Sequence, residues 1–137
     1  MSKPKVAFIC VYNSCRSQMA EAISKVYDSK IFDAYSAGVE ITREINPDAV
    51  DTIYELYGVN MEKSQKPKPL TELPDIDIVV TMGCGVECPY LPCKHHEDWG
   101  INDPSGKPYD EYMRTARIIE DKIRDLADRI VNKKNIF

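Results

Sequence analysis

A short apolar segment near the start of the chain leads through a polar loop into a pattern typical of an amphipathic helix. Residues 5–10, KVAFIC, follow Pro4 and stop at a polar loop, which predicts a short buried strand. From Ser17 onward, apolar residues recur at helical spacing, with charged residues on the opposite face. A strand, a tight loop and a helix in this order are typical of βαβ units, so this opening favours a parallel sheet.

The rest of the chain repeats this alternation of strands and helices. The further strands that we predict are residues 31–36, 75–82 and, from a weaker pattern, 94–99; the further helices are residues 46–58 and a long C-terminal segment marked by apolar positions from 109 to 130. Residues 60–75 are rich in Lys and Pro and predict a loop with one helical turn near Leu70. The sequence therefore predicts one α/β domain over residues 1–137, with a parallel sheet covered on both faces.

The helix predicted at residues 46–58 carries clear signals at both ends. Asn46 is a favoured N-cap residue, and Pro47 suits the first helical turn. Gly58 can end the helix, because glycine is the common residue at a helix C-terminus. These signals fix the boundaries of this element more closely than those of the others.

Composition narrows the classes of partner and the compartment. A formal charge of −4 and a pI near 5.2 argue against a nucleic-acid binder, which usually carries a basic face. No segment approaches the roughly 20 apolar residues of a membrane span, and residues 6–11 are too short for the apolar part of a signal peptide. We therefore expect a cytoplasmic protein with no nucleic-acid and no membrane partner.

The loop between the first strand and the first helix predicts an oxyanion site. Backbone N–H groups converge where a strand leads into a helix N-terminus, and the helix dipole adds positive potential there. Cys10 would lie at the floor of this cradle as a nucleophile, and Arg16 would donate two hydrogen bonds to a tetrahedral oxyanion. The predicted oxyanion-binding residues are Val11, Tyr12, Asn13, Ser14, Cys15, Arg16 and Ser17. The alternative is a strand-to-helix turn with buried structural thiols.

The five cysteines fall into two clusters, Cys10 with Cys15 and a second group of Cys84, Cys88 and Cys93. In a reducing cytosol, cysteines are more often catalytic, redox-active or metal-binding than part of a disulfide framework. His95 and His96 follow Cys93 closely, so zinc binding by these cysteines and histidines is an alternative role for the second cluster. Its ligand spacing matches no familiar zinc site, and we expect the histidines to be solvated residues of an edge strand.

Around Cys10, the segment CVYNSCRSQMAEA resembles the active-site loop of low-molecular-weight protein tyrosine phosphatases and, still more, that of the thioredoxin-coupled arsenate reductases of the same superfamily. The similarity continues in order through nearly the whole chain. It includes the segments YSAG, NPDAV, DIVVTM, CPYLP and EDWGINDPSGK. The resemblance implies a single-domain three-layer sandwich with a four-stranded parallel sheet.

The resemblance to arsenate reductases also implies a relay of three cysteines. Cys10 would attack arsenate, and Cys84 would displace arsenite and form a disulfide with Cys10. Cys88 would then attack Cys84, and a thiol donor would reduce the final disulfide. The short spacing of Cys84 and Cys88, with Gly83 before the first, resembles a branch whose members use low-molecular-weight thiols and a glutaredoxin-like partner. Thioredoxin and such a donor therefore both remain open, and Cys93 has no role in the relay.

The same resemblance implies that Asp103 is the general acid that protonates the leaving oxygen. The alternative is a plain turn at residues 103–106, DPSG. The phosphatases carry aromatic residues directly after this Asp-Pro to recognise phosphotyrosine, whereas this chain has Ser105 and Gly106.

Some reductases of this superfamily bind potassium beside the oxyanion loop. This chain keeps Asn13, Glu21 and Ser36 at the corresponding positions. The loop near residue 65 lacks the acidic ligand and offers Lys66 or Lys68, whose ammonium can replace the ion. We therefore expect no metal and no cofactor.

Three functions remain in view. The first is a cytoplasmic arsenate reductase that uses the cysteine relay. The second is a low-molecular-weight phosphatase that hydrolyses phosphoesters through a phosphocysteine at Cys10. The third is a non-catalytic oxyanion- or metal-binding module.

Overall fold

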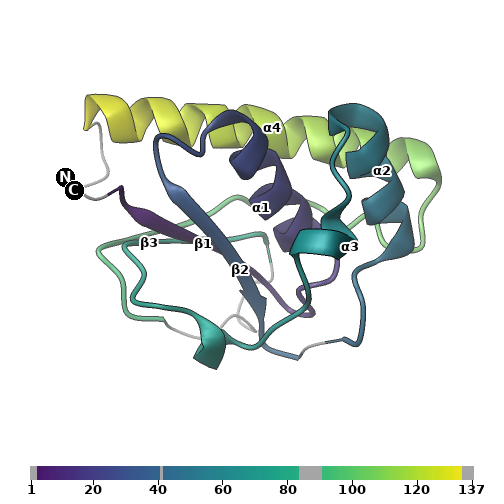
Figure 1. Cartoon of the computed structure of the whole chain (residues 1–137), viewed down its shortest axis with the longest axis horizontal. Coiled ribbons are helices and arrows are strands. Elements are labelled where there is room, and N and C mark those ends of the chain that lie inside the picture. The colour runs from purple at the N-terminus through teal and green to yellow at the C-terminus, as the bar shows by residue number, and fades with distance from the viewer. Residues whose placement is uncertain (1–2, 41, 84–90, 134–137) are drawn as a thin grey trace.

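The computed structural model describes residues 3–40, 42–83 and 91–133, and strands and helices alternate along the chain (Figure 1). The strands are β1 (Lys5–Cys10), β2 (Asp33–Gly38), β3 (Ile78–Thr81) and β4 (His95–Asp98). The helices are α1 (Arg16–Tyr27), α2 (Pro47–Tyr57), the single-turn α3 (Met61–Ser64) and α4 (Tyr109–Asn132), with a short 3-10 turn η1 (Leu70–Glu72) before β3. The predicted order of elements is confirmed. None of the helices in the described ranges is both long and apolar enough to cross a membrane.

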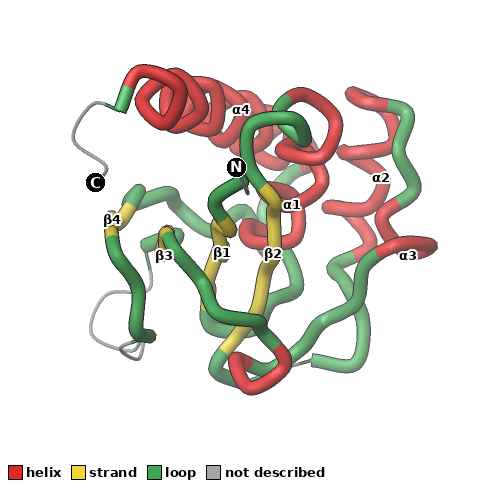
Figure 2. The backbone as a smooth tube through the Cα atoms, turned by 60° about the vertical axis from the view of Figure 1, so that its left-hand side comes forward, coloured by secondary structure: helices red, strands yellow, loops and turns green. Residues whose placement is uncertain are grey.

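The four strands form one parallel sheet in the order β2-β1-β3-β4, as Figure 2 shows from the side. In the register, Cys10 of β1 lies beside Gly38 of β2, and Thr81 of β3 lies beside Asp98 of β4. All four residues are at the carboxyl ends of their strands. Because ligands of parallel sheets bind outside these ends, this edge is where a functional site is expected.

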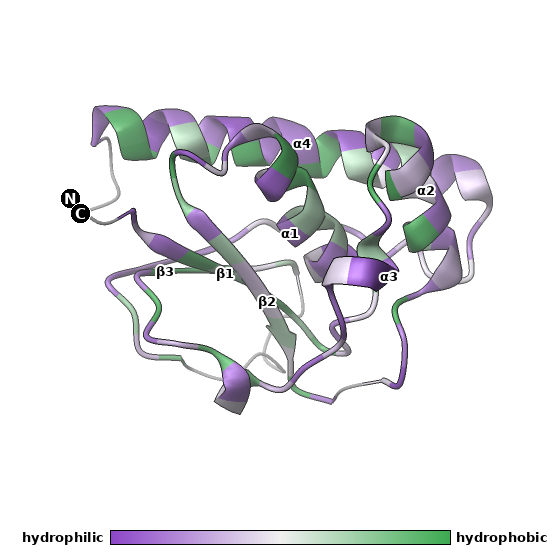
Figure 3. Ribbon diagram, in the orientation of Figure 1, coloured by the Kyte–Doolittle hydropathy of each residue, from purple (hydrophilic) through white to green (hydrophobic). Residues whose placement is uncertain are grey.

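The core fills the space between one face of the sheet and three helices. Val6 and Phe8 point into this space from β1, and apolar residues of α1, α2 and α4 pack against them. Figure 3 shows hydrophobic colours along the inner strands, whereas colours alternate along α4, whose outer side is polar. These helices cover only one face of the sheet.

The opposite face of the sheet has a smaller apolar cluster built on Ala7 and Ile9. Its cover comes from η1 and neighbouring loops, through side chains that include Leu70, Leu73 and Leu91. The three layers are therefore helices, sheet and a layer of loops with η1. The single helical turn predicted near Leu70 is confirmed, and it is the regular part of this third layer.

Three elements differ clearly from the sequence prediction. The third strand spans Ile78–Thr81 rather than residues 75–82. The second strand begins at Asp33 rather than residue 31, because the N–H groups of Ile31 and Phe32 both bond to the carbonyl of Asp28 in a turn that closes α1. Helix α3 was absent from the prediction, and the Asn60 side chain caps it by accepting from the N–H of Glu62. A four-residue helix is too short to produce a helical period in the sequence.

Glu97 of β4 and Arg129 of α4 form a bidentate ion pair that joins the edge strand to the C-terminal helix. Arg129 Nη1 and Nη2 each lie 2.8 Å from a carboxylate oxygen of Glu97. His95 Nε2, at 2.8 Å, and Trp99 Nε1, at 2.7 Å, also contact this carboxylate. Burial raises the pKa of Glu97, but the hydrogen bonds from Arg129, His95 and Trp99 outweigh it and lower the pKa to about 2.

We expect this carboxylate to make the fold acid-sensitive. The folded-state pKa of about 2 lies below the ordinary value of 4.5, so the stabilisation is complete above pH 4.5 and is lost as the pH falls towards 2. The contribution is up to about 3 kcal/mol at neutral pH, of which about 2 kcal/mol disappears by pH 3. Urea unfolding, followed by circular dichroism at pH 6 and pH 3, should therefore show the gap between wild type and Glu97→Gln narrowing at pH 3.

The matched control for this experiment is Asp125→Asn, which removes the second and more exposed carboxylate that pairs with Arg129. Its effect on the free energy of unfolding should be small, because exposed ion pairs contribute little. A gap between wild type and Glu97→Gln that is the same at both pH values would contradict the assignment.

Candidate active site

The loop between β1 and α1 has its carbonyl groups turned outward and held by neighbouring segments. The carbonyl of Val11 accepts from the N–H groups of Val39 and Glu40, both at 2.8 Å, and the carbonyl of Ser14 accepts from the N–H of Asn46, also at 2.8 Å. In the described part of the chain, no group accepts a hydrogen bond from the N–H groups of residues 12–15. These N–H groups, just before the N-terminus of α1, are the donors that the predicted oxyanion site requires, and we call them the donor ring.

Cys10 lies at the base of this ring and is 4% exposed. Its Sγ lies 2.8 Å from Ser17 Oγ, which in turn accepts a hydrogen bond from Asn13 Nδ2 at 2.8 Å. The Ser17 hydroxyl has a proton to donate to the sulfur and a second lone pair that can accept from the thiol, so either group can be the donor in this contact.

The backbone of Asn13 adopts the left-handed conformation that its residue type tolerates, with φ of 53°. Gly38 of β2 makes this possible, because a Cβ added at this position would lie 2.8 Å from the N atom of Asn13. Any side chain at residue 38 would therefore push the loop away from the sheet. The prediction of a tight loop at Asn13 is confirmed.

Two buried glutamines support the loop from behind, and the sequence analysis missed both. Gln18 Nε2 donates to the backbone O and to Oδ1 of Asn13, both at 3.0 Å. Gln65 Nε2 donates to Gln18 Oε1 at 2.8 Å. In the sequence, Gln18 is a polar residue on the apolar side of a helix, and Gln65 stands in a Lys-rich loop. Neither position indicates a hydrogen-bond partner.

Arg16 is the first residue of α1, and within the described residues only one of its nitrogens donates to the protein. Nη1 donates to the carbonyl of Met82 at 2.8 Å and to that of Ile101 at 2.6 Å. Nε and Nη2 are left as two donors on one edge of the guanidinium, and such a pair fits two oxygens of a tetrahedral oxyanion. The side chain is 8% exposed, so solvent screens it little.

Asp103 and Cys15 lie close to each other beside the loop. Burial raises the pKa of the Cys15 thiol far above its ordinary value, and the negative charge of Asp103 raises it further. Cys15 is therefore a protonated loop thiol rather than a second nucleophile. Asp103 Oδ1 accepts from the N–H and hydroxyl of Ser105, at 3.0 and 2.7 Å, so the DPSG segment is also the turn that its sequence indicates.

Lys68 occupies the position at which the sequence left a choice between two lysines. Its Nζ lies 3.6 Å from Glu21 Oε1, and Ser36 Oγ donates to the same oxygen at 2.6 Å. The backbone N–H of Lys68 donates to Asn13 Oδ1 at 2.9 Å. Lys25 pairs with the other carboxylate oxygen of Glu21. Two ammonium groups thus balance this buried carboxylate.

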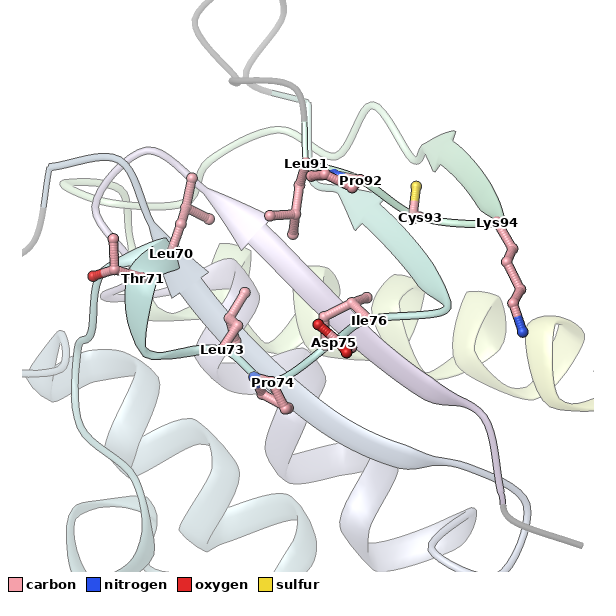
Figure 4. A pocket seen from close by; sticks show the side chains of 10 residues that line it. All are labelled: Leu70, Thr71, Leu73, Pro74, Asp75, Ile76, Leu91, Pro92, Cys93 and Lys94. Carbon is pink, nitrogen blue, oxygen red and sulfur yellow. The ribbon is translucent and has the colours of Figure 1, made fainter.

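Cys84 and Cys88, the predicted resolving cysteines, lie outside the described residues. Cys93 is half-buried and lines a groove of about 460 Å³ between η1 and the segment before β4. Figure 4 shows Cys93 and Lys94 at one end of this groove and Leu70 and Thr71 at the other. Within residues 3–40, 42–83 and 91–133, no three His, Cys, Asp or Glu residues are placed to hold a metal ion.

The two predicted solvated histidines differ in their surroundings. His96 is exposed on the edge strand β4, as expected, whereas the His95 ring contacts the Glu97 carboxylate and is mostly shielded. The polar residue at this edge that the sequence analysis missed is Asp98, whose carboxylate accepts from Thr81 Oγ1 at 2.6 Å and from the N–H of Gly83 at 3.0 Å. Asp98 is the last residue of β4, so it lies at the carboxyl edge of the sheet, as Cys10 does at the end of β1.

The chain is similar to proteins of one family along almost its whole length. The family described as "Low molecular weight phosphotyrosine protein phosphatase" matches residues 5–136. An arsenate reductase of Staphylococcus aureus (strain Newman) is 36% identical over 135 residues, which cover 94% of this chain and 100% of that protein.

Two solved structures support the same relationship. "An arsenate reductase in the phosphate binding state" superposes with a TM-score of 0.83 at 30% identity and covers 93% of this chain and 98% of its own. A thioredoxin-dependent arsenate reductase of Corynebacterium glutamicum superposes with a TM-score of 0.76 at 35% identity, covering 97% of this chain and 64% of its own.

Proposed function

The chain belongs to the low molecular weight phosphotyrosine protein phosphatase family, and on that premise we propose that it is an arsenate reductase that uses Cys10 as its nucleophile and Cys84 and Cys88 as its redox relay. The observation that carries the proposal is the contact of Cys10 Sγ with Ser17 Oγ at 2.8 Å, at the base of a ring of N–H donors beside Arg16. The similarity to proteins named arsenate reductase, at 36% identity over almost the full chain, supports arsenate as the substrate.

The first proposed step is attack of the Cys10 thiolate on arsenic(V). The loop N–H groups and Arg16 bind the oxyanion and balance the charge that develops on it. Asp103, at the edge of the loop, protonates the departing oxygen, which leaves as water. A covalent bond then joins Cys10 sulfur to arsenic, which is still in the +5 state.

The second proposed step is the reduction. The Cys84 thiolate attacks the sulfur of Cys10, the sulfur–arsenic bond breaks, and its electron pair leaves with arsenic, which becomes arsenite in the +3 state. The two cysteine sulfurs are oxidised to a disulfide. In sum, arsenate and two thiols give arsenite, a disulfide and water.

The relay then passes to Cys88, which attacks Cys84 and releases Cys10 as a free thiolate. A thiol reductant is required to reduce the final disulfide. We propose thioredoxin or a low-molecular-weight thiol with a glutaredoxin-like protein as the donor, in the reducing cytoplasm. The thioredoxin dependence named for the Corynebacterium glutamicum relative supports the first of these.

Hydrolysis of phosphoesters through a phosphocysteine is the second candidate function. The same ring of donors suits phosphate, and one related arsenate reductase has been described in a phosphate binding state. Ser105 and Gly106, which follow the Asp103-Pro104 pair, are both exposed and offer no aromatic surface for a phosphotyrosine ring. This favours arsenate over phosphotyrosine as the physiological substrate.

The direct experiment is arsenate-dependent oxidation of NADPH by the purified protein, coupled in parallel to thioredoxin with its reductase and to glutathione with glutaredoxin. Arsenic speciation should show one arsenite formed for each NADPH consumed, with one of the two donor systems clearly faster. Hydrolysis of p-nitrophenyl phosphate is measured alongside. Phosphatase turnover without arsenite in either donor system would overturn the reductase assignment.

A further inference from the structure

Three peptide groups of the loop between β1 and α1 are held in one orientation by three separate contacts. The carbonyls of Val11 and Ser14 accept from backbone N–H groups of neighbouring segments, and the carbonyl of Asn13 accepts from Gln18 Nε2 at 3.0 Å. The described residues contain no cis peptide bond. In a trans peptide, the carbonyl and the N–H of the next residue point in opposite directions. Each outward carbonyl therefore turns one N–H of the donor ring inward.

Of these three contacts, only that of Asn13 is made by a side chain. Gln18 on α1 is fully buried, and its Nε2 also donates to Asn13 Oδ1 at 3.0 Å. The peptide that it holds joins Asn13 to Ser14, so the N–H of this peptide is the Ser14 member of the donor ring. Asn13 is fully buried too, and a buried carbonyl is costly to leave without a donor. Without Gln18, this peptide gains from any turn that finds its carbonyl another partner, and its N–H then leaves the ring.

The orientation of the Gln18 amide is fixed by Gln65, which directly follows α3. Gln65 Nε2 donates to the backbone carbonyl of Gln18 at 3.0 Å and to Gln18 Oε1 at 2.8 Å. A backbone carbonyl can only accept, so the nitrogen of the Gln65 amide must face Gln18. Gln18 Oε1 then faces this nitrogen, which leaves Gln18 Nε2 to donate to Asn13. A backbone carbonyl at each end of this chain of amides thus sets the direction of its hydrogen bonds.

We propose that Gln18 is a positioning residue of the oxyanion site, which holds the peptide between Asn13 and Ser14 so that the Ser14 N–H donates to the bound oxyanion. Gln65 acts through Gln18. The proposal rests on the proposed function, because it concerns the site that would bind arsenate. In the described part of the chain, the hydrogen bonds of the Gln18 side chain reach neither Cys10 nor Arg16. Its replacement should therefore weaken oxyanion binding through one N–H rather than through the whole loop.

The test is a titration of the isotope-labelled protein with inorganic phosphate, followed by two-dimensional NMR of the backbone N–H groups. In wild type, phosphate should shift the N–H resonances of Tyr12, Ser14 and Cys15. In Gln18→Met, which keeps the side-chain length but loses the donor, the Ser14 shift should be mostly lost. The other two shifts should remain, because the carbonyls of Val11 and Ser14 keep their own partners. We expect Kd for phosphate to rise by about tenfold, since hydrogen bonds to charged groups are among the stronger ones.

The matched control is Ser24→Ala on the same helix. Ser24 is also buried, and its Oγ donates to the carbonyl of Ala20 at 2.7 Å. This variant loses a buried hydrogen bond to a carbonyl, as Gln18→Met does, but should change Kd for phosphate by less than about twofold, because its partner lies within the helix. An unchanged Ser14 shift or an unchanged Kd in Gln18→Met would overturn the proposal, as would an equal loss of the shifts at residues 12, 14 and 15.

The variant Gln65→Met tests the same chain of amides with the donor of Gln18 retained. It frees the Gln18 amide to turn, so Kd for phosphate should rise by about threefold. Adding this substitution to Gln18→Met should weaken binding no further, because Gln65 acts through Gln18. An unchanged Kd in Gln65→Met, or fully additive effects of the two substitutions, would overturn the link between the two glutamines.

Arsenate turnover gives an independent readout. Gln18→Met should lower kcat/KM for arsenate by about 10²-fold, because one donor to the oxyanion is lost; an unchanged value would contradict the proposal. The phosphate titration requires no turnover, so absence of arsenate reduction by the wild type would overturn the proposed function and leave the role of Gln18 intact. Absence of phosphate binding by the wild type would overturn the role of Gln18.

Discussion

Replacement of Cys10 by serine should abolish both arsenate reduction and hydrolysis of p-nitrophenyl phosphate. Cys10 is the last residue of β1, which places its sulfur at the base of the donor ring. Ser17 Oγ lies 2.8 Å from this sulfur. A serine hydroxyl at this position remains protonated at neutral pH and cannot form a disulfide. We therefore expect turnover with either substrate to fall by about 10⁴-fold or more.

The measurement requires a variant that is folded and still binds oxyanions. Phosphate should raise the midpoint temperature of thermal unfolding of Cys10→Ser as it does for wild type, because the N–H donors and Arg16 are retained. Cys93→Ser is the matched control, since Cys93 lies in the groove beside η1 and not in the donor ring. Turnover of Cys10→Ser comparable with that of wild type would exclude Cys10 as the nucleophile for both reactions.

The parts of the fold that follow from local chemistry were predictable from the sequence. The helix at residues 46–58 begins and ends as expected because Asn46 accepts from the N–H of Asp48 and Gly58 adopts a left-handed conformation with φ of 72°. The loop at Cys10 was predictable for the same reason, since Asn13 tolerates its φ of 53°. In these cases the residue type alone carries the structural requirement.

Contacts between distant segments were not predictable from residue types. Gln65 reaches Gln18 across 47 positions of sequence, and nothing in the pattern around either residue indicates a partner. Asp98 and Gly83 meet because the register of β3 and β4 places Thr81 beside Asp98. Register is set by tertiary packing, so a pattern within one strand cannot give the residue that lies opposite.

The covering of the sheet shows a further limit of sequence patterns. Alternating strands and helices predicted cover on both faces, and both faces are covered, but α1, α2 and α4 all pack against one of them. The other face relies on η1 and loop residues such as Leu73 and Leu91. These residues lie in segments without helical or strand periodicity, so their burial depends on the fold around them rather than on a local pattern.

Replacement of Cys84 by serine should separate the two halves of the proposed reaction. Cys84 is not part of the oxyanion loop, so Cys10 should still bind and attack an oxyanion. The attack on the Cys10 sulfur then lacks its thiolate, because a serine hydroxyl cannot form a disulfide. We expect arsenate reduction to fall by about 10³-fold or more, while phosphate still protects Cys10 against alkylation as it does in wild type.

The companion variant Cys88→Ser distinguishes a relay from direct reduction by the donor. If Cys88 regenerates Cys10, this variant should form about one arsenite per enzyme and then stop with a Cys10–Cys84 disulfide, which intact mass and peptide mapping identify. Wild-type steady-state turnover in Cys88→Ser would mean that the external thiol reduces the Cys10–Cys84 disulfide directly. Wild-type turnover in Cys84→Ser would exclude Cys84 as the resolving thiol, because the electrons that leave with arsenite would then come from another thiol.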